Sequence, residues 1–92
     1  MTFPQKALIS SVTSFGVFVE LENTIEGLIP LSMLGRDYTF NEEYLLLMDN
    51  TTKLCLQLND ELIVDLERAD KNNGKITFRL VEVCNPHKFN SR

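Results

Sequence analysis

The stretch Thr13–Leu21 reads TSFGVFVEL and decides the fold. From Phe15 to Leu21 the side chains alternate with a period of two, which predicts a β-strand with one buried and one outer face. The expected inward side chains are Val17, Val19 and Leu21, and the expected outward ones are Phe18 and Glu20. Lys6–Thr13, rich in β-formers and small polar residues, predicts a second strand. Ser14 lies between the two, so we expect a tight reversal there.

Three further segments have short-strand character, namely Ile25–Pro30, Glu61–Glu67 and Lys75–Leu80. The expected inward side chains are Leu62, Val64 and Leu66 in the second of these, and Ile76, Phe78 and Leu80 in the third, where Lys75, Thr77 and Arg79 face outward. Asn72-Asn73-Gly74 accepts positive φ at low cost and predicts a hairpin turn. Leu31–Leu34 is expected to form one helical turn. Five short strands in this order predict an all-β fold, a small closed barrel.

The segment between the third and fourth of these strands has two interpretations. In the first, Asn41 caps a helix over Tyr44–Met48. In the second, Tyr44–Met48 and Lys53–Gln57 are two strands of a hairpin. Apolar residues at Leu54, Leu56 and Leu58 recur with period two, and this alternation favours the hairpin.

Charge limits the functions that the chain can have. The 92 residues are enough for one domain, and the formal net charge is -4. Affinity for nucleic acid depends strongly on neutralising phosphates with Lys and Arg, so this charge argues against a simple nucleic-acid binder and predicts weak binding. The position of the basic side chains matters more than their total.

The sequence indicates neither catalysis nor a metal site. Cys55, Cys84 and His87 cannot supply four zinc ligands, and we expect two reduced thiols. The aspartates are scattered, whereas metal-dependent nucleases need clustered carboxylates. The chain has no apolar run of about 18 residues, and Met1–Lys6 does not form a signal peptide. We therefore expect a cytoplasmic protein without a cofactor, a metal or a membrane span, which is not itself an enzyme.

Four motifs resemble those of the S1 RNA-binding domain, in the same order. Thr13–Val19 resembles T-x-F-G-x-F-V, Glu26–Ser32 resembles E-G-L-(V/I)-H-x-S, Asn59–Val64 stands at G-D-x-(V/L)-x-V, and Ala69–Ile76 matches (I/V)-D…G-R-I. The resemblance covers residues 6–81 and implies a five-stranded OB-fold β-barrel. A short helical turn would follow the third strand, and an inserted hairpin or loop, residues 36–59, would precede the fourth. Residues 1–5 and 82–92 would be flexible ends or links to further domains.

The insert is similar to that of bacterial ribonuclease R, a processive 3′-to-5′ exoribonuclease. The segment from Asp37 to Asp60 is similar to its pattern D-Y-Y-x-F-(D/N)-E…L…T-G-K…L-G-D, with Thr52 and Asn59 in place of two of its glycines. The resemblance implies sequence-tolerant binding of single-stranded RNA by an accessory domain whose nuclease activity lies elsewhere. The implied partners are single-stranded RNA and the catalytic and cold-shock-type domains of the same polypeptide, and a monomer is expected.

Phe15 and Phe18 occupy positions that the S1 family uses for RNA. Three residues apart, they would face opposite sides of a regular strand, and either ring can instead belong to the core. Gly16 tolerates a bulge or a strong twist, which would bring both rings to the outer face to stack on bases. Lys75 stands where the family commonly has an Arg that contacts RNA, and Arg79 lies on the same face. Both are equally compatible with a solvated strand face.

Two further candidates come from the resemblance. Asp70 matches a family acid near the binding face and would accept a hydrogen bond from a base edge or a ribose hydroxyl, or it initiates a turn. Tyr38 would extend the stacking platform, or it packs the insert onto the barrel together with Phe40. Lys6 and Lys71 are weaker electrostatic candidates. Asp70 and Tyr38, together with Phe15, Phe18, Lys75 and Arg79, make up the six residues of the candidate site.

Pro30 departs from the family, which usually has a histidine there that can stack and donate a hydrogen bond. Proline offers only an apolar contact, so part of the family's site is altered. An alternative function is therefore an acidic protein-docking or structural barrel within a larger RNA-processing protein. Exposure of Leu45–Leu47 would favour this alternative, because a large apolar patch marks an interface.

Overall fold

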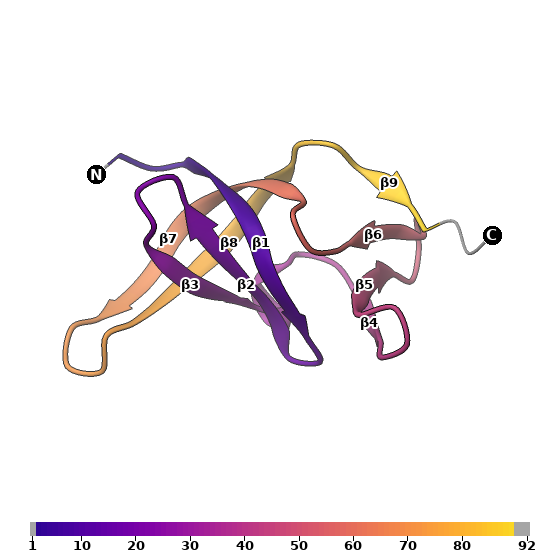
Figure 1. Ribbon diagram of the computed structural model, residues 1–92, viewed down its shortest axis with the longest axis horizontal. Coiled ribbons are helices and arrows are strands. Elements are labelled where there is room, and N and C mark those ends of the chain that lie inside the picture. Colours follow the sequence, from indigo (N-terminus) through magenta and orange to yellow (C-terminus); the bar gives the residue numbers. More distant parts are fainter. Residues whose placement is uncertain (1, 90–92) are drawn as a thin grey trace.

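Five strands close into a barrel, as the alternation predicts. The computed structural model describes residues 2–89. Its barrel strands are β1 (Gln5–Thr13), β2 (Gly16–Leu21), β3 (Glu26–Pro30), β7 (Glu61–Asp70) and β8 (Lys75–Val83). They follow one another around the barrel in the order β1-β2-β3-β8-β7 (Figure 1). The predicted five-stranded OB-type barrel is thus confirmed.

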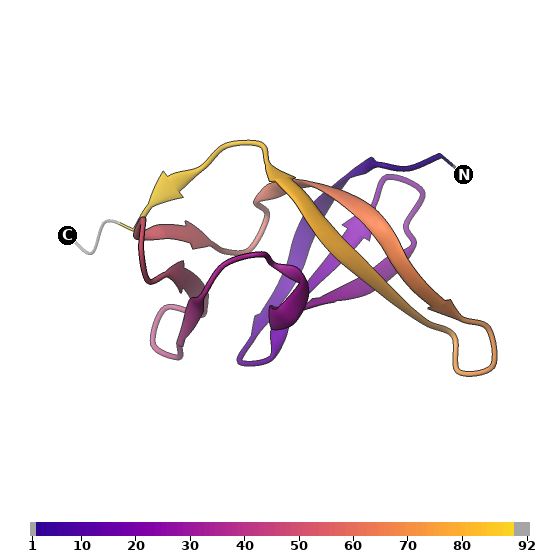
Figure 2. The same cartoon turned by 180° about the vertical axis from the view of Figure 1, so that it is seen from behind.

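The barrel core consists of the inward positions of these strands. Val17, Val19 and Leu21 of β2 are buried, as are Leu62 and Val64 of β7 and Phe78 of β8. Leu66 does not follow the prediction, because 39% of it is exposed. The register of the β7–β8 pair shifts between Leu66 and Arg68, and the hairpin then projects beyond the barrel (Figure 2). Leu66 therefore lies where the barrel no longer provides an opposite wall.

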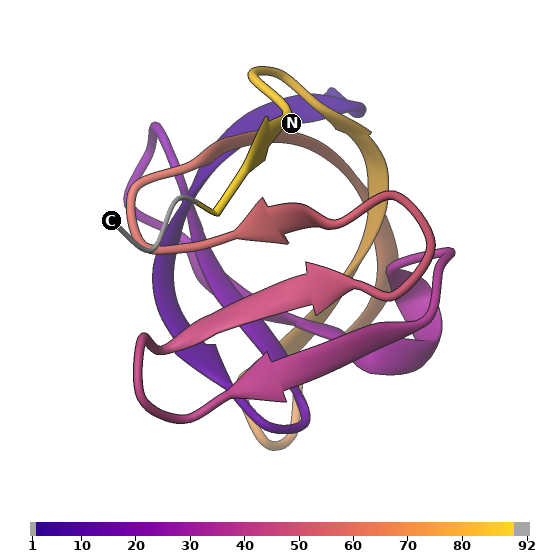
Figure 3. The same cartoon turned by 90° about the vertical axis from the view of Figure 1, so that its right-hand side faces the viewer.

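A second, four-stranded sheet covers one end of the barrel (Figure 3). It consists of β4 (Tyr38–Asn41), β5 (Leu46–Asp49), β6 (Leu54–Leu56) and β9 (His87–Lys88), in that order. Leu47 and Leu56 extend from this sheet into the main hydrophobic core. The insert is therefore a small sheet that closes the barrel, and not a loose loop.

The hairpin interpretation of the insert is confirmed. Asn41 Oδ1 accepts a hydrogen bond from the Tyr44 amide at 3.0 Å, as a helix cap would. The chain nevertheless turns at Leu45, whose φ is 53°, and enters β5. The predicted alternation in the partner strand is wrong, since Cys55 and Leu56 are both buried. Leu58 is exposed because β6 ends at Leu56.

The chain passes between the barrel and the second sheet at several points. The predicted helical turn is present as η1 (Leu31–Met33), which leads from β3 toward the second sheet. Beyond residue 81, the expected domain boundary, β8 continues to Val83 and the chain returns as β9 beside β6. His87 Nε2 lies 2.9 Å from Asp60 Oδ2, which attaches β9 to the loop before β7. The last part of the expected flexible end, residues 90–92, lies outside the described residues, as does residue 1.

Candidate nucleic-acid interface

Phe15 and Phe18 lie on the same outer side of the barrel. Phe15 is not part of the strand, since it stands in the two-residue turn between Thr13 and Gly16, which pair across β1 and β2. The alternation of side chains along β2 therefore does not determine which way the Phe15 side chain points. The two ring centroids are 6.2 Å apart with an interplanar angle of 89°, an edge-to-face pair. Phe15 is 55% exposed, so the predicted core alternative does not hold for this ring.

The turn that presents Phe15 is fixed from both sides. The Thr13 hydroxyl donates to the Gly16 carbonyl oxygen at 2.8 Å and accepts from the Phe15 amide at 3.2 Å. Gly16 has a φ of 151°, and an added Cβ would collide with the backbone of Ile29 and lie 2.9 Å from Pro30 Cα. Only glycine allows β2 to begin this close to β3.

A groove extends from the two rings across the outer face. It has a volume of about 370 Å³ and is lined by Phe15, Phe18, Gly27, Leu28, Gly74, Lys75, Ile76 and Thr77. The lining is largely apolar, and Lys75 is its one cation among residues 2–89. The structure thus brings together Phe15, Phe18 and Lys75, three of the six predicted site residues.

Asp70 lies beside this groove, opposite Lys75 in the β7–β8 ladder. Its carboxylate accepts hydrogen bonds from the amides of Asn72 and Asn73, at 3.0 and 3.3 Å, and from the Asn73 side chain at 3.0 Å. These hydrogen bonds hold the pKa of Asp70 below its ordinary value. Asp70 thus stabilises the turn, and its role toward RNA stays a prediction.

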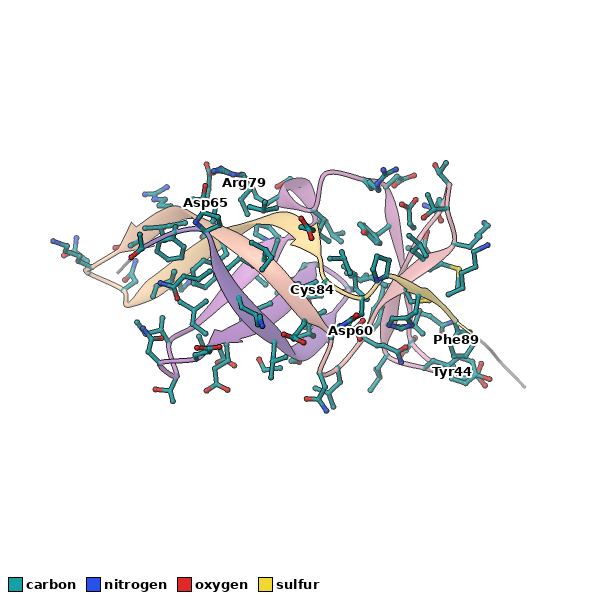
Figure 4. All side chains as sticks on the ribbon, turned by 90° about the horizontal axis from the view of Figure 1, so that it is seen from above. Tyr44, Asp60, Asp65, Arg79, Cys84 and Phe89 are labelled. Carbon is teal, nitrogen blue, oxygen red and sulfur yellow. The ribbon has the colours of Figure 1, made fainter. Side chains whose placement is uncertain are left out.

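Arg79 does not line the groove, because acidic side chains hold it elsewhere. One guanidinium nitrogen lies 2.5 Å from Asp65 Oδ2, and another lies 3.8 Å from Glu67 (Figure 4). Tyr38 lies in β4 of the second sheet, half-buried, where it packs on the core and burial raises its pKa. The structure does not bring either residue to Phe15 and Phe18.

The basic side chains are unevenly distributed. Among residues 2–89, Lys6, Arg36 and Arg79 form ion pairs with Glu61, Asp49 and Asp65. Those without an ion pair in this range are Lys53, Arg68, Lys71, Lys75 and Lys88. Three of them, Arg68, Lys71 and Lys75, belong to the projecting β7–β8 hairpin. Sequence reasoning missed Arg68, although its closeness to the predicted Asn-Asn-Gly turn was a usable signal.

A second groove, of about 500 Å³, lies along β1. It is lined by Lys6, Ala7, Leu8, Glu20, Leu21, Glu22, Thr24 and Glu61. Leu8 is 45% exposed, and three carboxylates face a single ammonium group. This groove therefore combines an apolar contact with negative charge.

The Leu45–Leu47 run forms no apolar patch. Leu46 and Leu47 are fully buried, and only Leu45 is exposed. Leu47 belongs to the core that joins the second sheet to the barrel.

Within residues 2–89, no three His, Cys, Asp or Glu side chains are grouped closely enough to hold a metal ion, and no helix is long and apolar enough to cross a membrane.

Comparison with known proteins gives one consistent family. The model of the S1 RNA binding domain matches residues 5–80. Ribonuclease R 1 of Lactococcus lactis is 39% identical over 74 residues, and ribonuclease R of Mycoplasmopsis pulmonis is 44% identical over 72 residues. These alignments cover 79% and 77% of this chain but only 9% and 10% of the relatives, so the chain spans a small part of their length.

Solved structures agree with the sequence matches. The apo form of Mycoplasma genitalium RNase R superposes with a TM-score of 0.77 at 26% identity, covering 84% of this chain and 12% of that chain. The same protein in complex with ribose methylated single-stranded RNA gives the same values.

Proposed function

The chain belongs to the S1 RNA-binding domain family, and from this premise we propose that it binds single-stranded RNA with little sequence preference. The observation that carries the proposal is the groove that begins at Phe15 and Phe18 and ends at Lys75. It combines exposed aromatic rings with a cation, the two features that single-stranded nucleic-acid sites share.

Base stacking would supply most of the affinity. Each stacked base contributes about 1–3 kcal/mol, and stacking tolerates any sequence because every base has a π-face. Phe15, at the tip of its turn, and Phe18, on the strand beside it, offer two such surfaces. Pro30 pairs with Gly16 across β2 and β3 and would add only an apolar edge.

The charged side chains around the groove would determine the path of the RNA backbone. Glu20 and Glu26 are exposed and lie opposite each other on β2 and β3, two pairs beyond Phe18 and Leu28. Their carboxylates repel phosphates, whereas Lys75 attracts them. We therefore propose that the RNA runs from the two rings toward the β7–β8 hairpin.

The wider setting is also part of this proposal. Relatives named ribonuclease R contain the matched segment as about a tenth of their length, 9% and 10% in two cases. We propose that the domain is an accessory part of a 3′-to-5′ exoribonuclease of that type, with catalytic and cold-shock-type domains in the same polypeptide. A monomeric state and a cytoplasmic location belong to the same proposal. The S1 domain would add binding, while another domain would cleave the RNA.

Fluorescence anisotropy with labelled oligo-U, oligo-A and oligo-C at low salt tests the RNA-binding proposal. Phe18→Ala should weaken binding to each about tenfold, the contribution of one stacked base. Tyr44→Ala is the matched control, since Tyr44 is an exposed aromatic residue in the turn between β4 and β5, beside Phe89 (Figure 4), and does not line the groove. No saturable binding by the wild type, or equal losses in both variants, would contradict the proposal.

The groove along β1 favours a second function, the docking of a basic polypeptide segment. Glu20, Glu22 and Glu61 surround exposed Leu8, and Lys6 neutralises only one of them, at 3.2 Å from Glu61. An anionic ligand such as RNA would be repelled here. A segment that carries Arg or Lys beside an apolar side chain would be complementary both in charge and in hydrophobic contact.

A labelled peptide of alternating arginine and leucine probes this groove. The double variant Glu20→Gln/Glu22→Gln should weaken its binding severalfold. Glu42→Gln/Glu43→Gln makes the same change in net charge on the exposed turn after β4, and it should have little effect. Equal effects of the two double variants would show attraction by net charge alone and would exclude a docking site.

A further inference from the structure

Thr77 has a special place in the RNA groove. Within the described part of the chain, it is the only lining residue with a hydroxyl side chain. It also stands where β3 and β8 pair, opposite Leu28. The closure of the barrel therefore fixes its position relative to Phe18, which pairs with Leu28 from the other side.

The Thr77 hydroxyl is available to a ligand. It makes no hydrogen bond to another group within residues 2–89, whereas other threonines of the chain, such as Thr13, Thr24 and Thr39, do. In the same range, no buried side-chain nitrogen or oxygen lacks a partner. The hydroxyl oxygen is therefore accessible, on a residue that lines the groove, and a hydroxyl can both donate and accept.

Phe18, Thr77 and Lys75 follow one another across the groove in the same order as the base, the ribose and the phosphate of a nucleotide. Phe18, Leu28 and Thr77 form a row across three adjacent strands, so Phe18 and Thr77 are about 10 Å apart at the backbone, at about 4.8 Å per strand. Lys75 is two residues from Thr77 on the same strand and face, a further 7 Å or so along β8. A base on Phe18 would thus place its ribose toward Thr77 and a phosphate toward Lys75.

We propose that the Thr77 hydroxyl hydrogen-bonds the ribose 2′-hydroxyl of the nucleotide whose base stacks on Phe18. The 2′-hydroxyl is the group that distinguishes RNA from DNA, so Thr77 would be the residue that makes this site prefer RNA. The inference rests on the proposed RNA-binding function. The sequence pointed to Asp70 for this role, but the turn of β7 and β8 already occupies its carboxylate.

The test compares oligo-U with oligo-deoxyuridine of equal length, by anisotropy, for the wild type, Thr77→Val and Thr77→Ser. Deoxyuridine lacks only the 2′-hydroxyl, and valine has nearly the shape of threonine. One net hydrogen bond corresponds to about fivefold in affinity. Wild type and Thr77→Ser should therefore prefer oligo-U about fivefold. Thr77→Val should lose this preference by weakening oligo-U alone.

The outcomes separate the inference from the function on which it rests. If wild type binds oligo-U and Phe18→Ala weakens it, but Thr77→Val keeps the wild-type preference, RNA binding stands and the role of Thr77 is overturned. If wild type does not bind oligo-U, both are overturned. If Thr77→Val fails to fold, the wild-type protein still tests the inference. Equal wild-type affinity for oligo-U and oligo-deoxyuridine would overturn it.

Discussion

Gly27 tests how closely β3 and β8 must approach to close the barrel. A Cβ added there would lie 2.6 Å from Cε2 and 2.8 Å from Cδ2 of Phe78, and 2.7 Å from the Ile76 carbonyl oxygen. Ordinary contact begins near 3.4 Å, so the Ile76 oxygen would have to retreat by about 0.7 Å, the difference between 3.4 and 2.7 Å. The Phe78 ring is fully buried and has no free space to enter.

Gly27→Ala should therefore be strongly destabilising. Overpacking of a core costs about 1–3 kcal/mol, and we expect the upper end because one of the colliding groups is a backbone carbonyl. For a domain of this size, about 3 kcal/mol lowers Tm by roughly 12–24 °C. Thermal unfolding followed by circular dichroism measures this loss directly.

Gly74→Ala provides the control for Gly27→Ala. Nothing lies within 4 Å of a Cβ at Gly74, although its φ of +66° makes a side chain strained. This backbone strain costs about 1–2 kcal/mol, so Gly74→Ala should lower Tm by less than Gly27→Ala does. A loss of less than 1 kcal/mol in Gly27→Ala would refute the close approach of β3 and β8.

Three further predictions concern charged residues. The amides of Thr51 and Thr52 hold the pKa of buried Asp49 below 3.8, so its charged form stabilises the fold above about pH 4 and this contribution is lost as pH falls further. Asp49→Asn should then lower Tm at pH 7, and its difference in Tm from wild type should shrink as pH falls below about 4. A difference that stays constant with pH would contradict this. Lys75→Gln should reduce the slope of log affinity against log salt by about 0.7, the value for one phosphate on a single strand. Arg79→Ala should leave oligo-U affinity within twofold, since its cation is paired, and a tenfold loss in the same titration would place it in the site.

The barrel was predictable because its signal is local. Alternation in β2 directly encodes which side chains are buried, and Val17 and Val19 are buried as expected. The second sheet was only partly predictable. β9 is a short strand whose existence depends on a partner far along the chain, β6, and on the contact of His87 with Asp60.

In the candidate site, too, the sequence predicts what depends on local pattern and does not predict what depends on pairing between strands. The outward direction of Arg79 followed from its strand, but its acidic partner did not. Near the turn, Asp70 pairs with Lys75, and an unbroken register would place Asp65 opposite Leu80. The shift between Leu66 and Arg68 instead places Asp65 opposite Arg79. A bulge changes the register by one residue, and nothing in the local pattern reveals it.

A net charge of -4 remains compatible with RNA binding because the charges are segregated. Carboxylates gather around Leu8 on β1, while Arg68, Lys71 and Lys75, which form no ion pair within residues 2–89, belong to the β7–β8 hairpin. With one cation in the groove itself, stacking must supply most of the affinity, and salt should weaken binding only slightly. In the proposed longer polypeptide, tethering would compensate for weak affinity, since a linked site acts at millimolar effective concentration. A weak site that depends on stacking would also release each base readily and accept the next one, whatever its identity, as the proposed accessory role requires.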